Sequence, residues 1–214
     1  MRYKNDIKYS YPKYNYPDFT NLKLDKNFCY YLGLLWSDGY VNDNKAIIEL
    51  NESDFSDIVE YIKNIGEFRY SIRQRKNRKN KISSCSIHSV KSCKWLIDLD
   101  YKEKSIKSPN KVLNLVPKDL IPYFYKGYFD GDGCIYIGKN SYQLYFCGSY
   151  EQDWEFIEKF LQDLDINYRI IRKEQNQNNR INKSSIVRIT KKEDIRKIMN
   201  YFPNIGLKRK KIDL

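Results

Sequence analysis

The sequence predicts an α+β fold made of two similar halves, each with the element order αββαββα. Two observations support this. The stretch YLGLLWSDGYV at residues 31–41 is matched by YKGYFDGDGCI at residues 125–135, and each ends a helical pattern and runs into a strand-like segment. The helical and strand-like patterns that follow also recur in the same order. Asp38 and Asp132 occupy equivalent positions, so the repeat offset from 38 to 132 is 94 residues.

Residues 1–26 form an N-terminal extension, 27–108 the first half, and 109–214 the second half, which begins with a linker. Apolar residues at three- to four-residue spacing predict helices, and alternating patterns bounded by turn residues predict hairpins. In the first half we expect helices over 28–37, 53–66 and 92–99 and hairpins over 40–50 and 68–90. In the second half we expect helices over 117–129, 151–164 and 191–202 and hairpins over 134–148 and 168–190.

The charge of the chain favours a polyanionic partner. The formal net charge is +12, and nucleic acid is the first candidate and an anionic membrane surface the second. The membrane is disfavoured, because we find no apolar run of spanning length and no strongly amphipathic basic helix. Five scattered cysteines suggest reduced thiols in an intracellular, reducing compartment. With one histidine, a zinc site has too few ligands at a recognisable spacing.

Small residues in each repeated stretch predict close contact between two helices. Gly33 and Ser37 lie one turn apart, as do Gly127 and Gly131. Small side chains at this spacing let helix backbones approach more closely than the usual 8–10 Å or so. Glycine inside a helix costs about 1 kcal/mol relative to alanine, so a compensating contact is expected.

The two aspartates predict a metal site at the ends of these helices. Asp38 and Asp132 fall in the last turn, near the negative end of the helix dipole, and each precedes a glycine expected to end the helix in the left-handed conformation. Two parallel helices would bring the carboxylates together, and a divalent cation would relieve their repulsion. Carboxylates together with water and substrate oxygens suit Mg²⁺, which can promote attack of water on a phosphodiester.

The repeated stretches resemble the motif of the LAGLIDADG homing endonucleases. In YLGLLWSDG and YKGYFDGDG, the first Gly, the penultimate Asp and the final Gly of the nine-letter name match in both copies. The sixth letter, Asp, matches only as Asp130, because the first copy has Trp36 there. The repeated element order extends the resemblance over nearly all the chain from residue 27. Two motifs in one chain resemble the single-chain, pseudo-symmetric members of the family.

This resemblance implies two LAGLIDADG halves whose antiparallel strands form a saddle along double-stranded DNA. The motif helices would form the interface, and Asp38 and Asp132 would be both catalytic residues and ligands of Mg²⁺ (or Mn²⁺), each cutting one strand. A monomer would act on a long non-palindromic site, as in intron homing. A basic residue near the end of each half commonly assists. The candidates are Lys104 in the first half and, in the second, Lys208 or Lys210, of which Lys208 is our choice.

Basic and polar residues on the predicted strands favour DNA contact through the saddle. In FRYSIRQR, Phe68, Tyr70 and Ile72 alternate with basic and polar residues, so one face can pack on helices while the other presents guanidinium groups. Arginine on a strand in a major groove reaches guanine edges and phosphates. The candidate DNA-binding residues are Arg69, Ser71, Arg73, Arg75, Tyr136, Gln143, Tyr145, Arg169, Arg172, Lys173 and Arg188.

Two functions remain open. The leading one is a metal-dependent, site-specific DNA endonuclease that hydrolyses phosphodiester bonds. The alternative is a duplicated LAGLIDADG protein that binds nucleic acid without cutting it, as a regulator or an intron splicing maturase. Carboxylates at two electrostatically poor helix ends favour cleavage, because a protein that only binds has no physical need for them.

Overall fold

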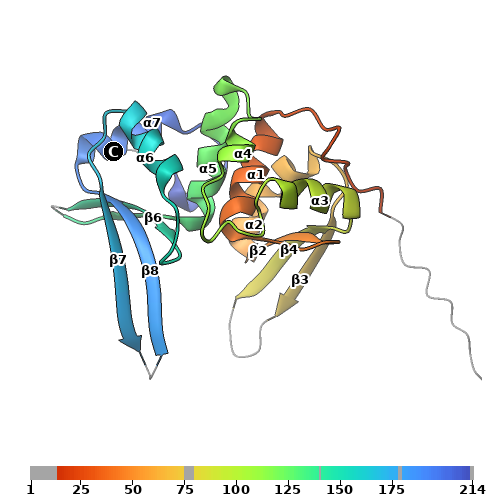
Figure 1. Ribbon diagram of the computed structural model, residues 1–214, viewed down its shortest axis with the longest axis horizontal. Coiled ribbons are helices and arrows are strands. Elements are labelled where there is room, and N and C mark those ends of the chain that lie inside the picture. Colours follow the sequence, from red (N-terminus) through yellow and green to blue (C-terminus); the bar gives the residue numbers. More distant parts are fainter. Residues whose placement is uncertain (1–13, 75–79, 140, 178–179, 213–214) are drawn as a thin grey trace, which may run out of the picture.

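The computed structural model describes residues 14–74, 80–139, 141–177 and 180–212 (Figure 1). The first half contains α1 (Lys26–Asp38), β1 (Gly39–Val41), β2 (Ala46–Asn51), α2 (Glu52–Lys63), β3 (Arg69–Gln74), β4 (Lys81–Ile87) and α3 (Val90–Asp98). The linker carries α4 (Asn110–Leu113) and a 3-10 turn, η1 (Lys118–Leu120). The second half contains α5 (Ile121–Asp132), β5 (Gly133–Ile137), β6 (Tyr142–Gly148), α6 (Glu155–Asp163), β7 (Arg169–Gln177), β8 (Arg180–Ile189), α7 (Lys192–Tyr201) and the 3-10 turn η2 (Lys208–Lys210).

Each half contributes one four-stranded antiparallel sheet. The strand orders are β1-β2-β4-β3 and β5-β6-β8-β7, so the two sheets have the same topology. The predicted α+β fold with two pseudo-symmetric αββαββα halves is confirmed. In Figure 1 the hairpins β3–β4 and β7–β8 extend from the same side of the helical layer, one from each half.

Most element boundaries differ from the prediction by one or more residues, and two of the differences have a clear local cause. Helix α6 begins at Glu155 rather than at residue 151, because the carboxylate of Asp153 accepts a hydrogen bond from the backbone N–H of Glu155, 2.9 Å away, and the chain turns before the helix. Within the last hairpin the pattern predicts strands over 168–174 and 185–190, but the ladder continues to residue 177 of β7 and residue 180 of β8. Its outer part is polar, so the apolar alternation used to predict it ends before the hydrogen-bonded ladder does.

Helices α1 and α5 lie side by side at the centre of the molecule, between the two sheets (Figure 1). A Cβ atom added to Gly33 would lie 1.9 Å from the carbonyl oxygen of Phe124, and one added to Gly127 would lie 2.0 Å from that of Tyr30. One added to Gly131 would lie 1.9 Å from Oγ of Ser37. Gly33 thus lies between Phe124 and Tyr128, and Gly127 lies between Tyr30 and Leu34. Since Gly131 meets Ser37 one turn further along both helices, α1 and α5 run in the same direction and end together.

Part of the predicted N-terminal extension packs on the first half. The side chain of Phe19 is 1% exposed and contacts the aromatic rings of Phe28 and Trp95. Ser92 of α3 fixes the backbone there, because its hydroxyl donates to the carbonyl of Pro17 and accepts from the N–H of Phe19. This segment therefore closes one end of the core.

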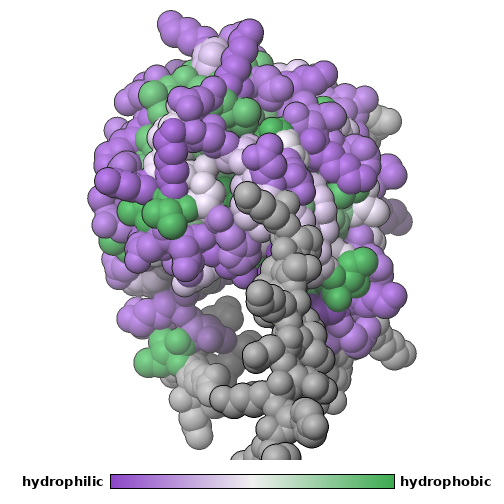
Figure 2. Space-filling model, turned by 90° about the vertical axis from the view of Figure 1, so that its right-hand side faces the viewer, coloured by the Kyte–Doolittle hydropathy of each residue, from purple (hydrophilic) through white to green (hydrophobic). Residues whose placement is uncertain are grey.

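The surface is mainly polar. Figure 2 shows one face on which hydrophilic side chains dominate and apolar ones form small separate groups. Within the described ranges, we find no helix with both the length and the apolar character needed to cross a bilayer.

Candidate active site

Asp38 and Asp132 are the last residues of α1 and α5, and a strand begins directly after each. The glycines that follow, Gly39 and Gly133, have φ of −81° and −84°, so our expectation of left-handed glycines is wrong. Steric crowding explains the glycines instead. A Cβ at either position would lie 2.4 Å from a carbonyl oxygen of the preceding helical turn. Glycine therefore allows a strand to begin at the residue that follows each helix. As a result, each aspartate lies at the junction between a helix and a strand.

The protein environment disfavours ionisation of both carboxyl groups. Burial raises the pKa of Asp132 to about 6, and the neighbouring charge of Asp38 adds to the rise. The side chain of Asp38 reaches solvent, yet surrounding protein atoms still raise its pKa by desolvation, while Lys210 and Lys104 oppose that rise. The two carboxylates therefore share one electrostatic environment at the foot of the helix pair.

This environment predicts a pH-dependent effect of Asp132→Asn on stability in the absence of metal. A folded-state pKa of about 6, above the ordinary value near 3.9, means that ionisation costs stability as pH rises from about 4 to 6. Two pKa units correspond to about 3 kcal/mol, which solvent screening of this partly exposed group reduces to about 1 kcal/mol. In EDTA at pH 7.5 the variant should melt about 2–4 °C higher than wild type, and the difference should vanish near pH 4.

The exposed Asp119, at the other end of α5, provides the matched control, and Asp119→Asn should show no such trend. Melting curves across this pH range in EDTA measure the effect. A wild-type protein that is the more stable one at pH 7.5 would contradict the assignment of burial as the dominant cause.

A lysine caps the carboxyl end of each motif helix. Lys104 Nζ donates to the carbonyl oxygens of Leu35, 3.4 Å away, and Ser37 in α1. Lys210 Nζ has three N–H donors to share among four carbonyl oxygens at the end of α5 and just beyond it, which lie 2.9, 2.6, 3.3 and 2.6 Å away in Phe129, Asp130, Gly131 and Gly133. Burial lowers the pKa of each lysine to about 8. A cation at this end offsets the helix dipole and stands beside the aspartates.

Our choice of Lys208 over Lys210 is not supported. Lys208 Nζ lies 3.0 Å from the carboxylate of Asp57 in α2, and its side chain is 81% exposed. Consecutive side chains of the 3-10 turn η2 point in different directions. Arg209 donates to both carboxylate oxygens of Asp54, at 2.8 and 2.9 Å, and Lys210 is the residue of this turn whose side chain is buried. Lys208 and Lys210 are only two residues apart, so the sequence could not show which of them lies beside the end of α5.

Asp130, the sixth letter of the second motif, is a buried structural residue. Its carboxylate accepts hydrogen bonds from Tyr30 Oη at 2.7 Å, Lys126 Nζ at 2.5 Å and the backbone N–H of Leu207 at 3.0 Å. These bonds join α1, α5 and the C-terminal segment. The side chains of Lys126 and Asp130 are only 2% and 0% exposed.

Asp130→Asn should destabilise the protein by about 3 kcal/mol, because it leaves the ammonium of Lys126 buried without its counter-charge. Urea unfolding at pH 7 measures the change. Glu60→Gln breaks the exposed pair with Lys63 (2.7 Å) and should cost less than about 0.5 kcal/mol. Equal effects of the two substitutions would contradict the structural role of Asp130.

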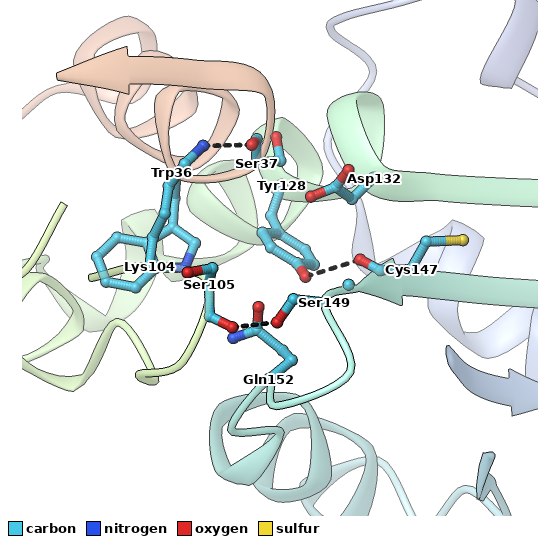
Figure 3. Close-up of a pocket in the computed structure, with 10 residues that line it drawn as sticks. Trp36, Ser37, Lys104, Ser105, Tyr128, Asp132, Cys147, Ser149 and Gln152 are labelled. Atoms are coloured by element: carbon cyan, nitrogen blue, oxygen red, sulfur yellow. Dashed lines mark hydrogen bonds between the residues drawn. The ribbon is translucent and has the colours of Figure 1, made fainter. Parts of the chain in front are cut away.

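A cavity of about 270 Å³ opens beside Asp132, between the two halves (Figure 3). The first half contributes Trp36, Ser37, Lys104 and Ser105 to its lining, and the second contributes Tyr128, Asp132, Cys147, Gly148, Ser149 and Gln152. The hydroxyl of Ser149 donates to the carbonyl of Ser105, so the walls from the two halves are joined. The cavity therefore adjoins the acidic pair on the side of Lys104.

The first sheet presents Arg69, Ser71 and Arg73 on one face, since these alternate residues pair with Ser86, Ser84 and Ile82 of β4. All three are exposed, and Arg73 forms an ion pair with Glu49 at 2.6 Å. Of the three apolar residues predicted to pack on helices, Phe68, just before β3, is buried as expected, but the two within β3 are not. Tyr70 and Ile72 are 37% and 63% exposed, because β3 is an edge strand. Arg75 lies outside the described residues.

The second sheet gathers all but one of the predicted residues on one face. Tyr145 pairs with Arg188, which in turn pairs with Arg169, and strand alternation places Lys173 on the same side. Tyr136 pairs with Gln143 and shares this face with them.

Arg172 is the exception and its assignment is corrected. It pairs with Ser185 on the other face of the sheet, and its guanidinium donates to the carbonyl of Gln152 at 3.3 Å.

Comparisons with known proteins agree with the fold described above. Residues 119–203 match the family model of the LAGLIDADG-like domain. Comparison with curated protein sequences gave no significant match. Among solved structures, I-DmoI in complex with DNA and Ca has a TM-score of 0.51 and 12% identity, over 80% of this chain and 86% of that chain. The N-terminal LAGLIDADG domain of DUF199/WhiA has a TM-score of 0.55 and 15% identity, over 92% and 91%.

Full-length DUF199/WhiA from Thermatoga maritima has a TM-score of 0.54 and 18% identity, over 90% of this chain. The match spans only 60% of the WhiA chain. At these identities the structural similarity establishes the fold, and the family match independently covers the second motif and most of the half that follows it. The chain therefore has the LAGLIDADG fold, and its residues 119–203 match the LAGLIDADG-like domain.

Proposed function

We propose that this chain is a site-specific DNA endonuclease that hydrolyses both strands of a long, non-palindromic duplex site as a monomer, with a divalent metal ion. The observation that carries the proposal is the pair of carboxylates, Asp38 and Asp132, brought together at the ends of two closely packed helices. A lysine stands beside each helix end, and a basic strand face flanks the pair on each side. I-DmoI, similar in fold, was solved in complex with DNA and Ca.

The acidic pair fits Mg²⁺ (or Mn²⁺) rather than a metal that needs a complete protein cage. Within the described part of the chain, no cluster of three or more His, Cys, Asp or Glu side chains suits a metal. Mg²⁺ typically uses one or two carboxylates and fills its remaining positions with water and substrate phosphate oxygens. Asp38 and Asp132 would hold the ion. When bound, it would polarise the phosphodiester and lower the pKa of water.

The residues of the chain itself have distinct roles in this proposal. Lys104, which lines the cavity and lies near both carboxylates, offers a cation to the negative charge that develops on the phosphate. Its pKa of about 8 keeps it mostly protonated at pH 7. Lys210 is 5% exposed and engaged by four carbonyls, so it acts as a positioning residue that fixes the end of α5.

The strand faces are proposed to hold the duplex mainly through phosphate contacts. Replacing Arg69, Arg73, Arg169 or Lys173 singly with alanine should weaken DNA binding and make the log–log salt slope shallower by about 1 for each phosphate left without its cation. Arg172→Ala is the matched control, because this arginine has the same chemistry but lies on the other face. Fluorescence anisotropy at several salt concentrations measures both quantities. A slope changed only by Arg172→Ala would contradict the assignment of faces.

A randomised duplex library tests the activity. Purified protein should linearise a small, sequence-related subset of molecules with Mg²⁺ and none with EDTA. Sequencing of the ends should show one recurrent break on each strand at a fixed offset. Binding without breaks under both conditions would overturn the nuclease proposal.

A nucleic-acid-binding protein that does not cut is the second candidate. One observation favours it. Backbone carbonyls accept the hydrogen bonds of the Lys210 ammonium, so Lys210 is less available than Lys104 to contact a phosphate. A regulator or a splicing maturase would bind its nucleic acid with the same salt dependence. The library experiment separates the two candidates, because only the nuclease needs Mg²⁺ to produce ends.

A further inference from the structure

The single histidine of the chain, His88, stands in a cluster of positive charge on the proposed DNA face of the first sheet. Ser86 of β4 pairs with Arg69 of β3, and Nε2 of His88 lies 3.5 Å from Oγ of Ser86, so the imidazole is on the same side of the sheet. Burial, and then the charges of Lys45 and Arg69, lower the pKa of His88 below its usual value near 6.5. His88 and Arg69 are exposed, so a ligand from solvent can reach them.

The segment before α1 packs against the imidazole. The ring of Tyr16 lies 6.0 Å from that of His88, and Tyr14 stacks on Tyr16 with 5.4 Å between ring centroids. The carboxylate of Glu67 is the negative charge that acts on Tyr16, and it accepts a hydrogen bond from the backbone N–H of Asn15 at 2.9 Å. Aromatic rings therefore hold the imidazole from one side, and the nearby carboxylate is engaged by the backbone.

The positive charges of the cluster lack an anionic partner. Lys45 and Arg69 form no ion pair with any residue in the part of the chain that the structure describes. Ammonium and guanidinium groups can only donate hydrogen bonds, and a protonated imidazole donates from both nitrogens. An anion among these groups would relieve their mutual repulsion and accept charge-assisted hydrogen bonds. A phosphate group fits this requirement.

The second half repeats this chemistry at the equivalent position. Arg169 pairs with Arg188 at the place that Arg69 takes in the first sheet. A cavity of about 320 Å³ opens there, and its lining consists of Asn167, Tyr168, Arg169, Arg188, Thr190 and Lys191, of which three are cations. Thr190 follows the paired residue by two positions, as His88 does in the first half. A titratable imidazole is therefore a feature of the first half alone.

We propose that His88 and Lys45, together with Arg69, bind one backbone phosphate of duplex DNA, and that Tyr16 positions the imidazole for this contact. The inference rests on the proposed binding of DNA and adds a contact outside the strands, since Lys45 precedes β2 and His88 follows β4. A phosphate favours the protonated imidazole, so the pKa of His88 is higher in the complex than in the free protein. DNA affinity therefore gains from His88 below the free pKa and loses that gain above the bound pKa.

NMR of the imidazole tests this contact directly, because the one histidine of the chain needs no assignment. The pKa of His88 is measured with and without a saturating random-sequence duplex that covers both sheets, in EDTA so that no cleavage occurs. It should rise by about one unit or more, as expected when an opposite charge comes within about 4–6 Å. Lys94→His is the control for the general field of DNA. This exposed residue of α3 lies in the helical layer (Figure 1), so the pKa of the added imidazole should rise less than half as much.

Anisotropy binding of wild type and His88→Gln gives an independent measurement. At pH 8 the two proteins should bind the duplex alike, because the imidazole is neutral. Near pH 5.5 wild type should bind about five- to tenfold more tightly, since a rise of about one pKa unit is worth about tenfold in affinity. Asp132 also titrates in this range, but it does so in both proteins. The melting temperature should be the same, because His88 is exposed.

The outcomes separate this contact from the proposed function. If the duplex binds but the pKa of His88 stays unchanged, or rises no more than that of the histidine in Lys94→His, the phosphate contact is wrong while DNA binding stands. If no duplex binds at any pH, the proposed function fails as well. Inorganic phosphate at the same phosphate concentration should leave the pKa of His88 unchanged. An equal rise with inorganic phosphate would assign the cluster to free anions and overturn the DNA contact.

Discussion

Asp38→Asn and Asp132→Asn are each expected to lower the rate of double-strand cleavage at least about a thousandfold, while DNA affinity changes less than about threefold. Asparagine has nearly the same shape but carries no charge to hold a divalent cation. Burial makes ionisation of both carboxyl groups costly in the free protein, and the charge of Asp38 adds to that cost at Asp132, so a bound cation would gain from both groups. Removing either should therefore damage both strand cuts.

Plasmid linearisation and nicking, measured beside anisotropy binding, separate cleavage from affinity. Asp119→Asn serves as the control, since this exposed carboxylate lies at the opposite end of α5 and should have no effect. If both active-site variants cut both strands at the wild-type rate, the catalytic roles of Asp38 and Asp132 are wrong.

Gly127→Val is expected to destabilise the protein by about 4 kcal/mol or more, and to prevent folding if the helices cannot separate. The added Cβ would lie 2.0 Å from the carbonyl oxygen of Tyr30 and 2.8 Å from the backbone nitrogen of Leu34. These are backbone atoms of α1, which cannot turn aside as a side chain can. Because α1 and α5 end at the acidic pair, any separation would also misplace Asp132, so surviving protein should lose cleavage.

Gly138→Ala is the matched control for this substitution. Its Cβ would meet Oγ of Ser141 at 2.8 Å and the ring of Tyr136 at 3.1 Å, and both side chains can move. The cost there should stay below about 1 kcal/mol. Thermal melting and urea unfolding measure both variants. Unchanged stability and activity in Gly127→Val would remove close helix packing as the basis of the site.

The duplication made the fold predictable, because each motif is followed by the same order of elements. The prediction placed the motif helix at 28–37, and α1 runs from Lys26 to Asp38, since its apolar residues are continuous and a glycine ends it. The starts of other elements were less accurate. Local hydrogen bonds such as that from Glu155 to Asp153 decide where a helix starts, and the apolar period does not record them.

The sequence predicts those site residues whose place follows from the spacing of the motif. It does not predict those whose orientation depends on three-dimensional packing. Asp38 and Asp132 follow from the motif, but the inward lysine of η2 depends on how a 3-10 turn directs neighbouring side chains. Arg172 lies on the wrong face because strand alternation was counted without a known register.

The most direct test of a shared cation site is anomalous diffraction from crystals of the protein grown with Mn²⁺. One strong peak or a close group of peaks between the carboxylates of Asp38 and Asp132 is expected, and it should disappear in the Asp38→Asn, Asp132→Asn double variant. Manganese bound only elsewhere, with both carboxylates free of it at saturating Mn²⁺, would contradict a metal-dependent nuclease built on this helix pair.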